Sequence, residues 1–312
     1  MCTYNGEKFI KEQIDSILYQ TLKVNEIIIC DDGSVDNTTG ILENYSYENP
    51  DLFKIYHNEI NLRSVKNFEK AISLCSGDFI FLSDQDDIWV ENKVEKMLAY
   101  FNQNPKINAL ATNGFCINDK SKILEKYSIW DVPEFLRTHK LEVDYFKLIS
   151  YVGNIATGAS MAIKKSIIKD ILPFPIVEGF HHDEWIAIIT ANTKSFELLN
   201  EKYFYYRVHA LQQVGGVFYD RNKFNLLLFD LNIKNLNFKI LKKRIKKTIN
   251  FIKLNELIKT IDHKNVLDYK KNIETSQLYL IDSKKQLKTK YPIKKIILDI
   301  IDKIQNKRQL NY

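Results

Sequence analysis

The sequence predicts an α/β fold in which a mostly parallel sheet is flanked by helices on both faces. Two observations support this prediction. Residues 1–120 alternate between apolar segments with helical spacing and short apolar runs typical of buried strands. Two of those runs end on clustered carboxylates, at 31–32 and at 84–87. Strand–helix alternation favours parallel strands, and ligands bind beyond the carboxyl ends of such strands.

The alternation can be followed element by element. We predict helices at residues 9–18, 36–45, 64–75 and 90–103, and strands at 26–30, 53–57, 79–82 and 107–116. Residues 1–6 are expected to form the turn after a first strand that the given sequence lacks. In a parallel sheet the first strand is usually central, so without it backbone hydrogen-bonding edges would be exposed. We therefore expect the natural start to lie upstream, or the gene to be a fragment.

The pattern is less regular beyond residue 118. Residues 119–140 have the polar composition of a loop, whereas small residues at 153–163 predict a bulged strand beside a pocket. A helix is predicted to begin near residue 181, followed by strands at 196–199 and 203–208.

Charge divides the chain near residue 221. Residues 221–312 hold 23 Lys and Arg against 8 Asp and Glu, a net charge of +15, while residues 1–220 have a net charge of −9. Apolar residues in the basic segment recur at helical spacing over 241–252 and 292–304. We predict an α/β domain at 1–220 and an all-helical, Lys/Ile-rich appendage at 221–312.

Composition excludes several classes of protein. Hydrophobic residues make up 45% and charged residues 27% of the chain, as in ordinary globular proteins. No run reaches the roughly 18 apolar residues that span a bilayer, and charges interrupt the N-terminus where a signal peptide would be apolar. The four cysteines lack metal or disulfide spacing, which indicates reduced thiols. We expect a cytoplasmic protein, with peripheral contact at the inner face of the membrane as an option for the basic segment.

Three carboxylates follow the predicted strand at 79–82 within four positions. They are Asp84, Asp86 and Asp87. Unpaired charge is costly to bury, so we expect them at the exposed end of the strand, where a shared cation would relieve their repulsion. Mg²⁺ and Mn²⁺ favour clustered carboxylate oxygens. The alternative is an acidic turn that caps the next helix.

Six short motifs occur in order along residues 1–218. They are Thr3-Tyr4-Asn5-Gly6, Asp31-Asp32-Gly33-Ser34, Asn61 with Asn67-Phe68, Ser83-Asp84-Gln85-Asp86-Asp87-Ile88-Trp89, His182-Asp183-Glu184-Trp185 and Tyr206-Arg207-Val208-His209. The set resembles family 2 glycosyltransferases of the GT-A fold, especially the bacterial rhamnosyltransferase-like branch. The resemblance implies an inverting, metal-dependent transfer of a sugar, rhamnose among the candidates, from a nucleotide diphosphate sugar donor. The implied acceptor is a growing surface polysaccharide or a lipid-linked glycan.

The resemblance places Thr3, Tyr4 and Asp32 in the nucleotide pocket. A carboxylate at a strand end accepts well from the imide N–H of a base, and Tyr4 can stack on that base. For the acidic turn that includes Asp32, the alternative is a turn that caps a helix.

Asp84 and Asp86 form a D-x-D pattern, in which alternate residues share one side of an extended chain. One of them can hold ribose or sugar hydroxyls while the other binds Mg²⁺ or Mn²⁺, with Asp87 sharing that task. Because the sequence has no glycine-rich phosphate loop with a lysine, the cation has to neutralise the leaving diphosphate. The resemblance adds His209 as a metal or diphosphate contact, and the alternative is an ordinary loop histidine.

Asp183 is the candidate general base. An inverting transfer needs one carboxylate within hydrogen-bond reach of the acceptor hydroxyl, and a helix N-terminus favours its negative form. Glu184 competes for this role, and a simple helix cap is the alternative for Asp183. One residue departs from the family pattern. Arg63 stands where the family commonly has glycine, so it either reaches the donor phosphates or marks a degenerate site.

The basic segment has several interpretations: packed helices with solvated lysines, contact with an anionic membrane surface, packing on the acidic domain, or pairing between subunits. It carries no nucleic-acid recognition motif, so no nucleic-acid partner is expected. Two alternatives to an active glycosyltransferase stay open. One is a catalytically inactive sugar-nucleotide-binding or membrane-associated protein of the same fold, and the other is a nucleotidyltransferase.

Overall fold

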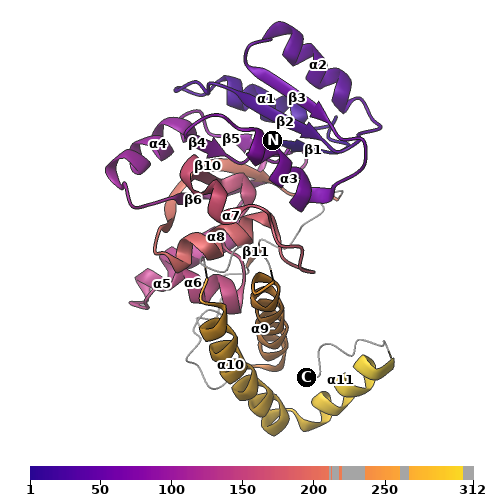
Figure 1. The fold of residues 1–312 in the computed structure, drawn as a ribbon, viewed down its shortest axis with the longest axis vertical. Coiled ribbons are helices and arrows are strands. Elements are labelled where there is room, and N and C mark those ends of the chain that lie inside the picture. The colour runs from indigo at the N-terminus through magenta and orange to yellow at the C-terminus, as the bar shows by residue number, and fades with distance from the viewer. Residues whose placement is uncertain (211, 213–217, 220–235, 261–266, 305–312) are drawn as a thin grey trace. The chain divides into compact units, whose positions relative to one another are not determined.

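The structure is a computed structural model that describes residues 1–210, 212, 218–219, 236–260 and 267–304 (Figure 1). The chain forms two compact units. Unit 1 comprises Met1–Val143, Ile155–Phe174 and His181–Arg221, and unit 2 comprises Asp144–Asn154, Pro175–Phe180 and Asn222–Tyr312. Unit 2 therefore takes two short segments from within the first 220 residues, which composition alone did not indicate.

Unit 1 begins with a three-stranded parallel sheet in the order β1-β2-β3. Its strands are β1 (Cys2–Thr3), β2 (Ile27–Asp31) and β3 (Phe53–His57). Every residue of β2 is buried, as expected for a parallel strand that is covered on both faces. The prediction for residues 1–6 needs a correction, because Cys2 and Thr3 form a strand and only the residues after them turn.

The helices predicted in this region are confirmed, with small shifts at their ends. They are α1 (Ile10–Leu18), α2 (Thr38–Glu48), α3 (Arg63–Leu74) and α4 (Lys93–Gln103). In α1 the residues with helical spacing, Ile10, Ile14 and Ile17, are the buried ones. This stripe packs on the protein interior while the lysine and glutamate residues between them stay exposed.

A second, mixed sheet has the strand order β4-β9-β6-β10-β5, with β7 paired to β6. The strands are β4 (Phe79–Phe81), β5 (Ile88–Trp89), β6 (Ala109–Ile117), β7 (Ile123–Leu124), β9 (Met161–Lys164) and β10 (Phe196–Arg207). Only β6 and β10 are parallel neighbours here; the other pairs are antiparallel. The two strands predicted at 196–199 and 203–208 form one strand, because register shifts on either side of Lys202 let β10 continue along β6.

The segment at 119–140 is not the plain loop that its polar composition suggested. It contains β7, β8 (Tyr127–Ser128), a short 3-10 turn and α5 (Val132–Thr138). Trp130 is fully buried, with its ring 5.0 Å from that of Phe204 and 5.2 Å from that of Tyr206. One large apolar side chain therefore anchors an otherwise polar segment.

The rest of unit 1 supplies two helices, α7 (Ile168–Ile171) and α8 (His182–Asn192), and β11 (Phe218–Tyr219), which pairs with β8. The prediction of a bulged strand over 153–163 was wrong for most of its length. Residues 158–160 form a 3-10 turn, and only β9 is extended.

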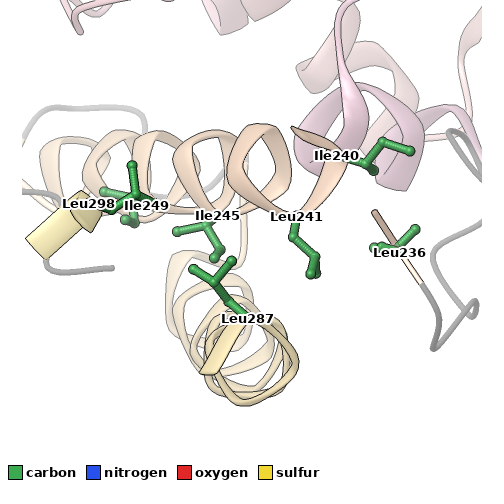
Figure 2. Packing of buried hydrophobic residues seen from close by; sticks show 7 residues of the cluster. All are labelled: Leu236, Ile240, Leu241, Ile245, Ile249, Leu287 and Leu298. Atoms are coloured by element: carbon green, nitrogen blue, oxygen red, sulfur yellow. The ribbon is translucent and has the colours of Figure 1, made fainter. Parts of the chain in front are cut away.

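Unit 2 contains α6 (Tyr145–Lys147), α9 (Phe238–Ile258), α10 (Tyr269–Lys290) and α11 (Pro292–Ile304). Figure 2 shows its core, in which Leu241, Ile245 and Ile249 of α9 lie near Leu287 of α10. The helices predicted in the basic segment are thus confirmed. Residues 221–235, 261–266 and 305–312 of that predicted segment lie outside the described residues. In the described part of the chain, no helix is long and apolar enough to cross a membrane.

Candidate active site

The turns that follow β1 and β4 are held together by one glutamine. The Gln85 side chain donates to the Tyr4 carbonyl at 3.0 Å and accepts from the Tyr4 N–H at 2.8 Å. A Cβ on Gly6 would lie 2.4 Å from Gln85 Oε1, so this close approach needs glycine. Sequence reasoning assigned no role to Gln85, although it lies within the acidic motif.

Asp31 and Thr3 hold the first two strands in register at their ends. The Thr3 hydroxyl donates to Asp31 at 2.7 Å, and the Ser34 hydroxyl donates to the same carboxylate at 2.6 Å. The backbone N–H groups of Gly33 and Ser34 donate to its other oxygen. Both Thr3 and Asp31 are 1% exposed, so these side chains support the turn from the inside.

Asp32 is buried at the end of β2 and fixes the segment that leads into α3. Its carboxylate accepts from the Asn58 side chain at 2.8 Å and from the backbone N–H groups of Leu62 and Arg63 at 2.7 and 2.8 Å. Arg63 has a φ of +61°, in the left-handed region that favours glycine. The backbone at this position therefore suits the glycine that the resemblance led us to expect there.

Asp84 and Asp87 lie in a region of concentrated negative charge after β4. Desolvation, and then the nearby carboxylates of Asp86 and Asp183, raise the pKa of Asp84 to about 7. Asp183 contributes to this shift although it is distant in sequence, so the structure brings it towards the acidic turn. Asp87 is 1% exposed, and burial followed by repulsion from Asp86 and Asp84 raises its pKa well above the ordinary value.

Asp86 and His209 form a direct pair. His209 Nε2 lies 2.9 Å from Asp86 Oδ2, and the two side chains are 10% and 19% exposed. The imidazole also lies against Phe9, with ring centroids 4.9 Å apart. The structure therefore brings together two of the residues that we predicted as metal ligands.

Arg207 supports this pair from behind. Its side chain is fully buried and donates to the Asp86 carbonyl at 2.7 Å, to Ser121 Oγ at 2.9 Å and to Glu12 Oε2 at 2.7 Å. Its backbone N–H donates to Asp87 Oδ1 at 2.9 Å. The motif that contains Arg207 was noted from the sequence, but its positioning role depends on contacts with residues up to 195 positions away.

Lys93 is a buried cation near the same carboxylates. Its ammonium group donates to the Ala159 carbonyl at 2.6 Å and lies 4.5 Å from the Trp89 ring centroid. Burial lowers its pKa to about 7, and the charges of Asp87 and Asp84 oppose that shift. Sequence analysis did not identify Lys93 as a site residue. A lysine at the start of a predicted helix is normally exposed, and no local sequence pattern indicates that this one is buried.

Asp183 lies in the first turn of α8, where backbone groups fix its carboxylate. Gly158 N–H donates to Oδ2 at 3.1 Å, and Glu184 N–H donates to Oδ1 at 2.6 Å. Asp183 is half-buried, whereas its competitor Glu184 is only 3% exposed. His182 is also buried and stacks on Phe68 at 3.8 Å between centroids.

Whether these residues suit a divalent cation can be judged from their donor atoms. Over the described residues, no three His, Cys, Asp or Glu side chains are close enough to form a complete metal site. Two predicted ligands, Asp86 and His209, are already paired. The second oxygen of Asp87 is buried and has no hydrogen-bond partner in the described part of the chain. A buried carboxylate oxygen without a partner is costly, and a cation would supply one. The donor set therefore fits a cation whose coordination is completed by a ligand's phosphates.

Comparison with known proteins decides the family. A family model described as "Glycosyl transferase family 2" matches residues 1–172, more than half of the chain. The chain belongs to glycosyl transferase family 2. The match covers the turns after β1, β2 and β4, and it ends before α8 and His209.

Curated relatives carry glycosyltransferase names. The chain is 28% identical over 211 residues to the "Uncharacterized glycosyltransferase MJ1057" of Methanocaldococcus jannaschii, covering 67% of this chain and 69% of that protein. It is 29% identical over 195 residues to the Escherichia coli "UDP-Glc:alpha-D-GlcNAc-diphosphoundecaprenol beta-1,3-glucosyltransferase WfgD", covering 62% and 70%. It is 27% identical over 229 residues to the "dTDP-rhamnosyl transferase RfbG" of Shigella flexneri, covering 69% and 74%. Two further relatives are matched over 48% and 63% of their lengths.

Solved structures confirm the GT-A fold of this family 2 chain. TarS of S. aureus, residues 1–349 in complex with UDP-GlcNAc, has a TM-score of 0.53 at 15% identity, covering 92% of this chain and 71% of that one. The mannosyltransferase PcManGT from Pyrobaculum calidifontis, in complex with GDP-Man and Mn²⁺, has a TM-score of 0.52 at 13% identity, covering 94% and 74%. At these identities the likeness concerns the fold alone.

Proposed function

We propose that this family 2 glycosyltransferase moves a sugar, with inversion, from a nucleotide diphosphate sugar to a hydroxyl of a surface polysaccharide or lipid-linked glycan. The observation that carries the proposal is the convergence of Asp84, Asp86 and Asp183 on one acidic region. Such a region can hold a cation at the donor while keeping one carboxylate for the acceptor. The names of the relatives WfgD and RfbG support a UDP- or dTDP-linked donor, with rhamnose among the candidate sugars.

For the donor, we propose a division of labour within the nucleotide pocket. Tyr4 is 39% exposed at the end of β1, so its ring is available to stack on a base. Thr3 and Asp32 are buried and already bonded, so they act by fixing the turns on either side of that ring. Asp84, half-buried after β4, is the candidate for the ribose or sugar hydroxyls.

We propose Asp86, Asp87 and His209 as the residues that would hold Mg²⁺ or Mn²⁺. The cation would stabilise the negative charge that builds on the diphosphate as it leaves. Arg207 keeps Asp86 and Asp87 in place through the Asp86 carbonyl and through its own backbone N–H. PcManGT, whose structure contains GDP-Man and Mn²⁺, supports a divalent cation in a protein of this fold.

Asp183 is the proposed general base. It accepts the proton of the acceptor hydroxyl while the acceptor oxygen bonds to the anomeric carbon and the bond from that carbon to the diphosphate breaks. Two backbone N–H groups, of Gly158 and Glu184, orient its carboxylate. Glu184 is less suited to the role because its side chain is almost fully buried.

A donor screen with matched variants tests the proposal. UDP-glucose, dTDP-rhamnose and GDP-mannose are incubated with a lipid-linked glycan acceptor and Mg²⁺ or Mn²⁺, and release of the nucleoside diphosphate is measured. We expect turnover with one donor class, its loss on chelation, and its recovery when the cation is returned. Asp183→Asn should lower kcat by about 100-fold or more with nucleotide binding unchanged.

The exposed Asp51 offers a control, because it lies just before β3 and outside the turns that follow β1, β2 and β4, so Asp51→Asn should leave turnover unchanged. Full turnover by Asp183→Asn would reject the general base. Nucleotide-sugar binding without turnover under any of these conditions would favour a catalytically inactive protein of the same fold.

We further propose that unit 2 brings the enzyme to lipid-linked acceptors at an anionic membrane surface. Residues 221–312 have a net charge of +15. On α11 the apolar residues Ile293, Ile296, Ile297 and Ile300 are each at least 50% exposed. A helix with exposed isoleucines beside lysines has the composition of interfacial helices that bind anionic lipid.

A further inference from the structure

Lys93 is a fully buried lysine whose presence packing alone does not explain. Its ammonium group lies 4.5 Å from the Trp89 ring centroid and 5.2 Å from that of Phe204. Burying a charged group is unfavourable, and an apolar residue of the same length would fill this space without that penalty. Among the described residues, the Ala159 carbonyl is the one hydrogen-bond acceptor of the ammonium group, at 2.6 Å. The contact with Ala159 is therefore the specific feature that a lysine supplies here.

The backbone that carries Lys93 is held by two other elements. Val90 N–H donates to the Tyr203 carbonyl of β10 at 3.0 Å. The Gln20 side chain, just after α1, donates to the Val90 carbonyl at 2.8 Å and accepts from Val94 N–H at 3.0 Å. Because these bonds flank Lys93 on both sides in the sequence, its side chain starts from a defined position.

The residue that Lys93 contacts belongs to the 3-10 turn at 158–160, and this turn orients Asp183. Gly158 N–H donates to Asp183 Oδ2 at 3.1 Å. The other donor to this carboxylate is Glu184 N–H, which belongs to the same helix as Asp183. Over the described residues, Gly158 is therefore the one group outside α8 that hydrogen-bonds to Asp183. The direction of the carboxylate depends on where the turn lies.

The turn has little freedom to move by itself. A Cβ on Gly158 would lie 2.9 Å from His182 Nε2, so the backbone there lies directly against the buried imidazole. Ser160 N–H donates to the Thr157 carbonyl at 3.0 Å and closes the turn. Since Gly158 and Ala159 are neighbours within it, displacing the Ala159 carbonyl would also displace the Gly158 N–H.

Lys93 also lies near the carboxylates on the donor side of the proposed site. The charges of Asp87 and Asp84 oppose the fall that burial causes in the pKa of Lys93. Trp89, whose ring contacts the ammonium group, lies in β5, which directly follows the acidic turn. One side chain on a fixed backbone is therefore close to the donor carboxylates and hydrogen-bonded to the turn beside Asp183.

We propose that Lys93 is a positioning residue for the general base: its ammonium group fixes the Ala159 carbonyl and, through the 158–160 turn, the Gly158 N–H that orients Asp183. The inference rests on the proposed function, because it takes Asp183 as the base. Lys93 needs no contact with the substrate in this role. A shift of about 1 Å in a reacting group can cost about 100-fold in rate, so a turn that holds the base matters for turnover.

Hydrogen exchange of the full 312-residue protein tests this role without any substrate. Lys93→Met removes the ammonium group but keeps an unbranched apolar side chain. We expect it to speed exchange of the Gly158 amide by about tenfold or more, with less than about twofold change at Ile29 in the buried strand β2. Lys96→Met, at an exposed position of α4, is the matched control and should change neither amide. Unchanged exchange at Gly158, or equal acceleration at Gly158 and Ile29, would overturn the proposal.

Turnover gives a second, independent test. We expect Lys93→Met to lower kcat by about tenfold or more with the donor KM changed less than about threefold, because the residues proposed to contact the donor are retained. In an Asp183→Asn background the same substitution should lower kcat by less than about twofold, since the carboxylate that it positions is absent. Fully additive losses, or a raised donor KM with kcat unchanged, would mean that Lys93 acts elsewhere and would reject the inference.

A second variant covers the case in which methionine prevents folding. Lys93→Gln removes the charge and shortens the side chain by one atom, so it should lose the contact with Ala159 and show the same selective acceleration at Gly158. Acceleration at neither amide in this variant would contradict the proposal. A native protein without turnover in the donor screen would reject the proposed function, and the exchange comparison would still show whether Lys93 holds the Gly158 N–H.

Discussion

Arg63 occupies a backbone conformation that glycine adopts more easily. Its φ is +61°, and its N–H is required there as a donor to Asp32. Any residue with a Cβ is strained in this region by about 1 kcal/mol, whereas glycine is not. Arg63 therefore holds this turn at an energetic cost that glycine would avoid.

Replacing this residue should therefore stabilise the protein. We expect Arg63→Gly to raise the free energy of unfolding by about 1 kcal/mol, measured by urea denaturation. Arg63→Ala is the matched control, because it removes the exposed side chain but keeps the Cβ, and it should leave stability nearly unchanged. If alanine stabilises as much as glycine, the side chain rather than the backbone is the source of the strain.

His182 is a buried imidazole that the fold keeps neutral. Burial lowers its pKa to about 4, partly offset by Asp183. Neither ring nitrogen has a hydrogen-bond partner in the described part of the chain. The unfolded chain binds a proton near pH 6.5 while the folded chain does not until about pH 4. The stability contributed by neutral His182 is therefore complete above about pH 6.5 and is lost as the pH falls towards 4.

A variant that lacks His182 should lose that part of the pH dependence. We expect the free energy of unfolding of the native protein to fall between pH 6.5 and pH 4 by up to about 3 kcal/mol more than that of His182→Leu. Denaturation at a series of pH values measures the difference. His181→Leu, at the half-buried neighbouring position, removes only a minor contribution to the lowered pKa of His182 and should retain most of the native slope. Parallel pH profiles for the native protein and His182→Leu would contradict the assignment.

At the scale of elements, Arg207 joins three segments that are far apart in the sequence. Glu12 belongs to α1, Asp86 to the turn after β4, and Ser121 to the turn between β6 and β7. Phe9 packs on the guanidinium carbon at 4.5 Å from its ring centroid. The end of β10 thus fixes the acidic turn relative to the first helix.

Removing the guanidinium should loosen all three segments. We expect Arg207→Met to lower the free energy of unfolding by about 3 kcal/mol, because the Asp86 carbonyl loses the donor that the fully buried Arg207 supplies. Glu12→Gln keeps an acceptor for Arg207 in a half-exposed position and should cost less than about 1 kcal/mol. Urea denaturation compares the two. Similar losses for both variants would mean that the Glu12 ion pair, and not the buried network, carries the effect.

The helices and strands were largely predictable from the sequence, because a pattern within a short stretch of residues marks each of them. Apolar spacing marks α1 and β2, and the acidic motif marks the end of β4, within windows of a dozen residues or fewer. The residues that contact these elements could not be predicted in this way, because the contacts join positions that are far apart in the sequence. His209 meets Asp86 across 123 positions, and the direction in which Asp87 faces follows from β10 and not from its own neighbours.

The wrong predictions for residues 119–140 and 153–163 also have physical explanations. Polar composition at 119–140 concealed a fold whose buried side chains include Trp130 and its neighbours Val132 and Leu136. Small residues at 153–163 suggested extension, but the Gly158 N–H instead donates to Asp183, which fixes a 3-10 turn there. The buried state of Lys93 could not be predicted, because the aromatic rings that surround it come from β5 and β10.

At the scale of the whole molecule, the proposed binding of unit 2 to an anionic surface rests on the charge of residues 221–312 and on the exposed isoleucines of α11. We expect the protein to sediment with vesicles that contain phosphatidylglycerol at low salt, and to be released at about 0.5 M salt, where charge interactions are screened. Replacing two α11 residues, Ile296→Ser with Ile300→Ser, should reduce binding severalfold. Leu278→Ser, at a 70% exposed position on α10, is the control and should bind as the native protein does. Equal binding to phosphatidylcholine vesicles would contradict an electrostatic interface.

The contact between Glu12 and Arg207 has a consequence for how the enzyme is made. A ribosome releases the N-terminal region first, so α1 and the acidic turn are available long before residue 207 is synthesised. Until β10 emerges, Asp86 has neither its histidine nor the arginine that holds its backbone. A nascent chain that ends at residue 172 would contain every strand-end carboxylate of the family match and still lack a finished site. The proposed site is therefore completed only once the end of β10 and His209 have been synthesised and have packed on the acidic turn.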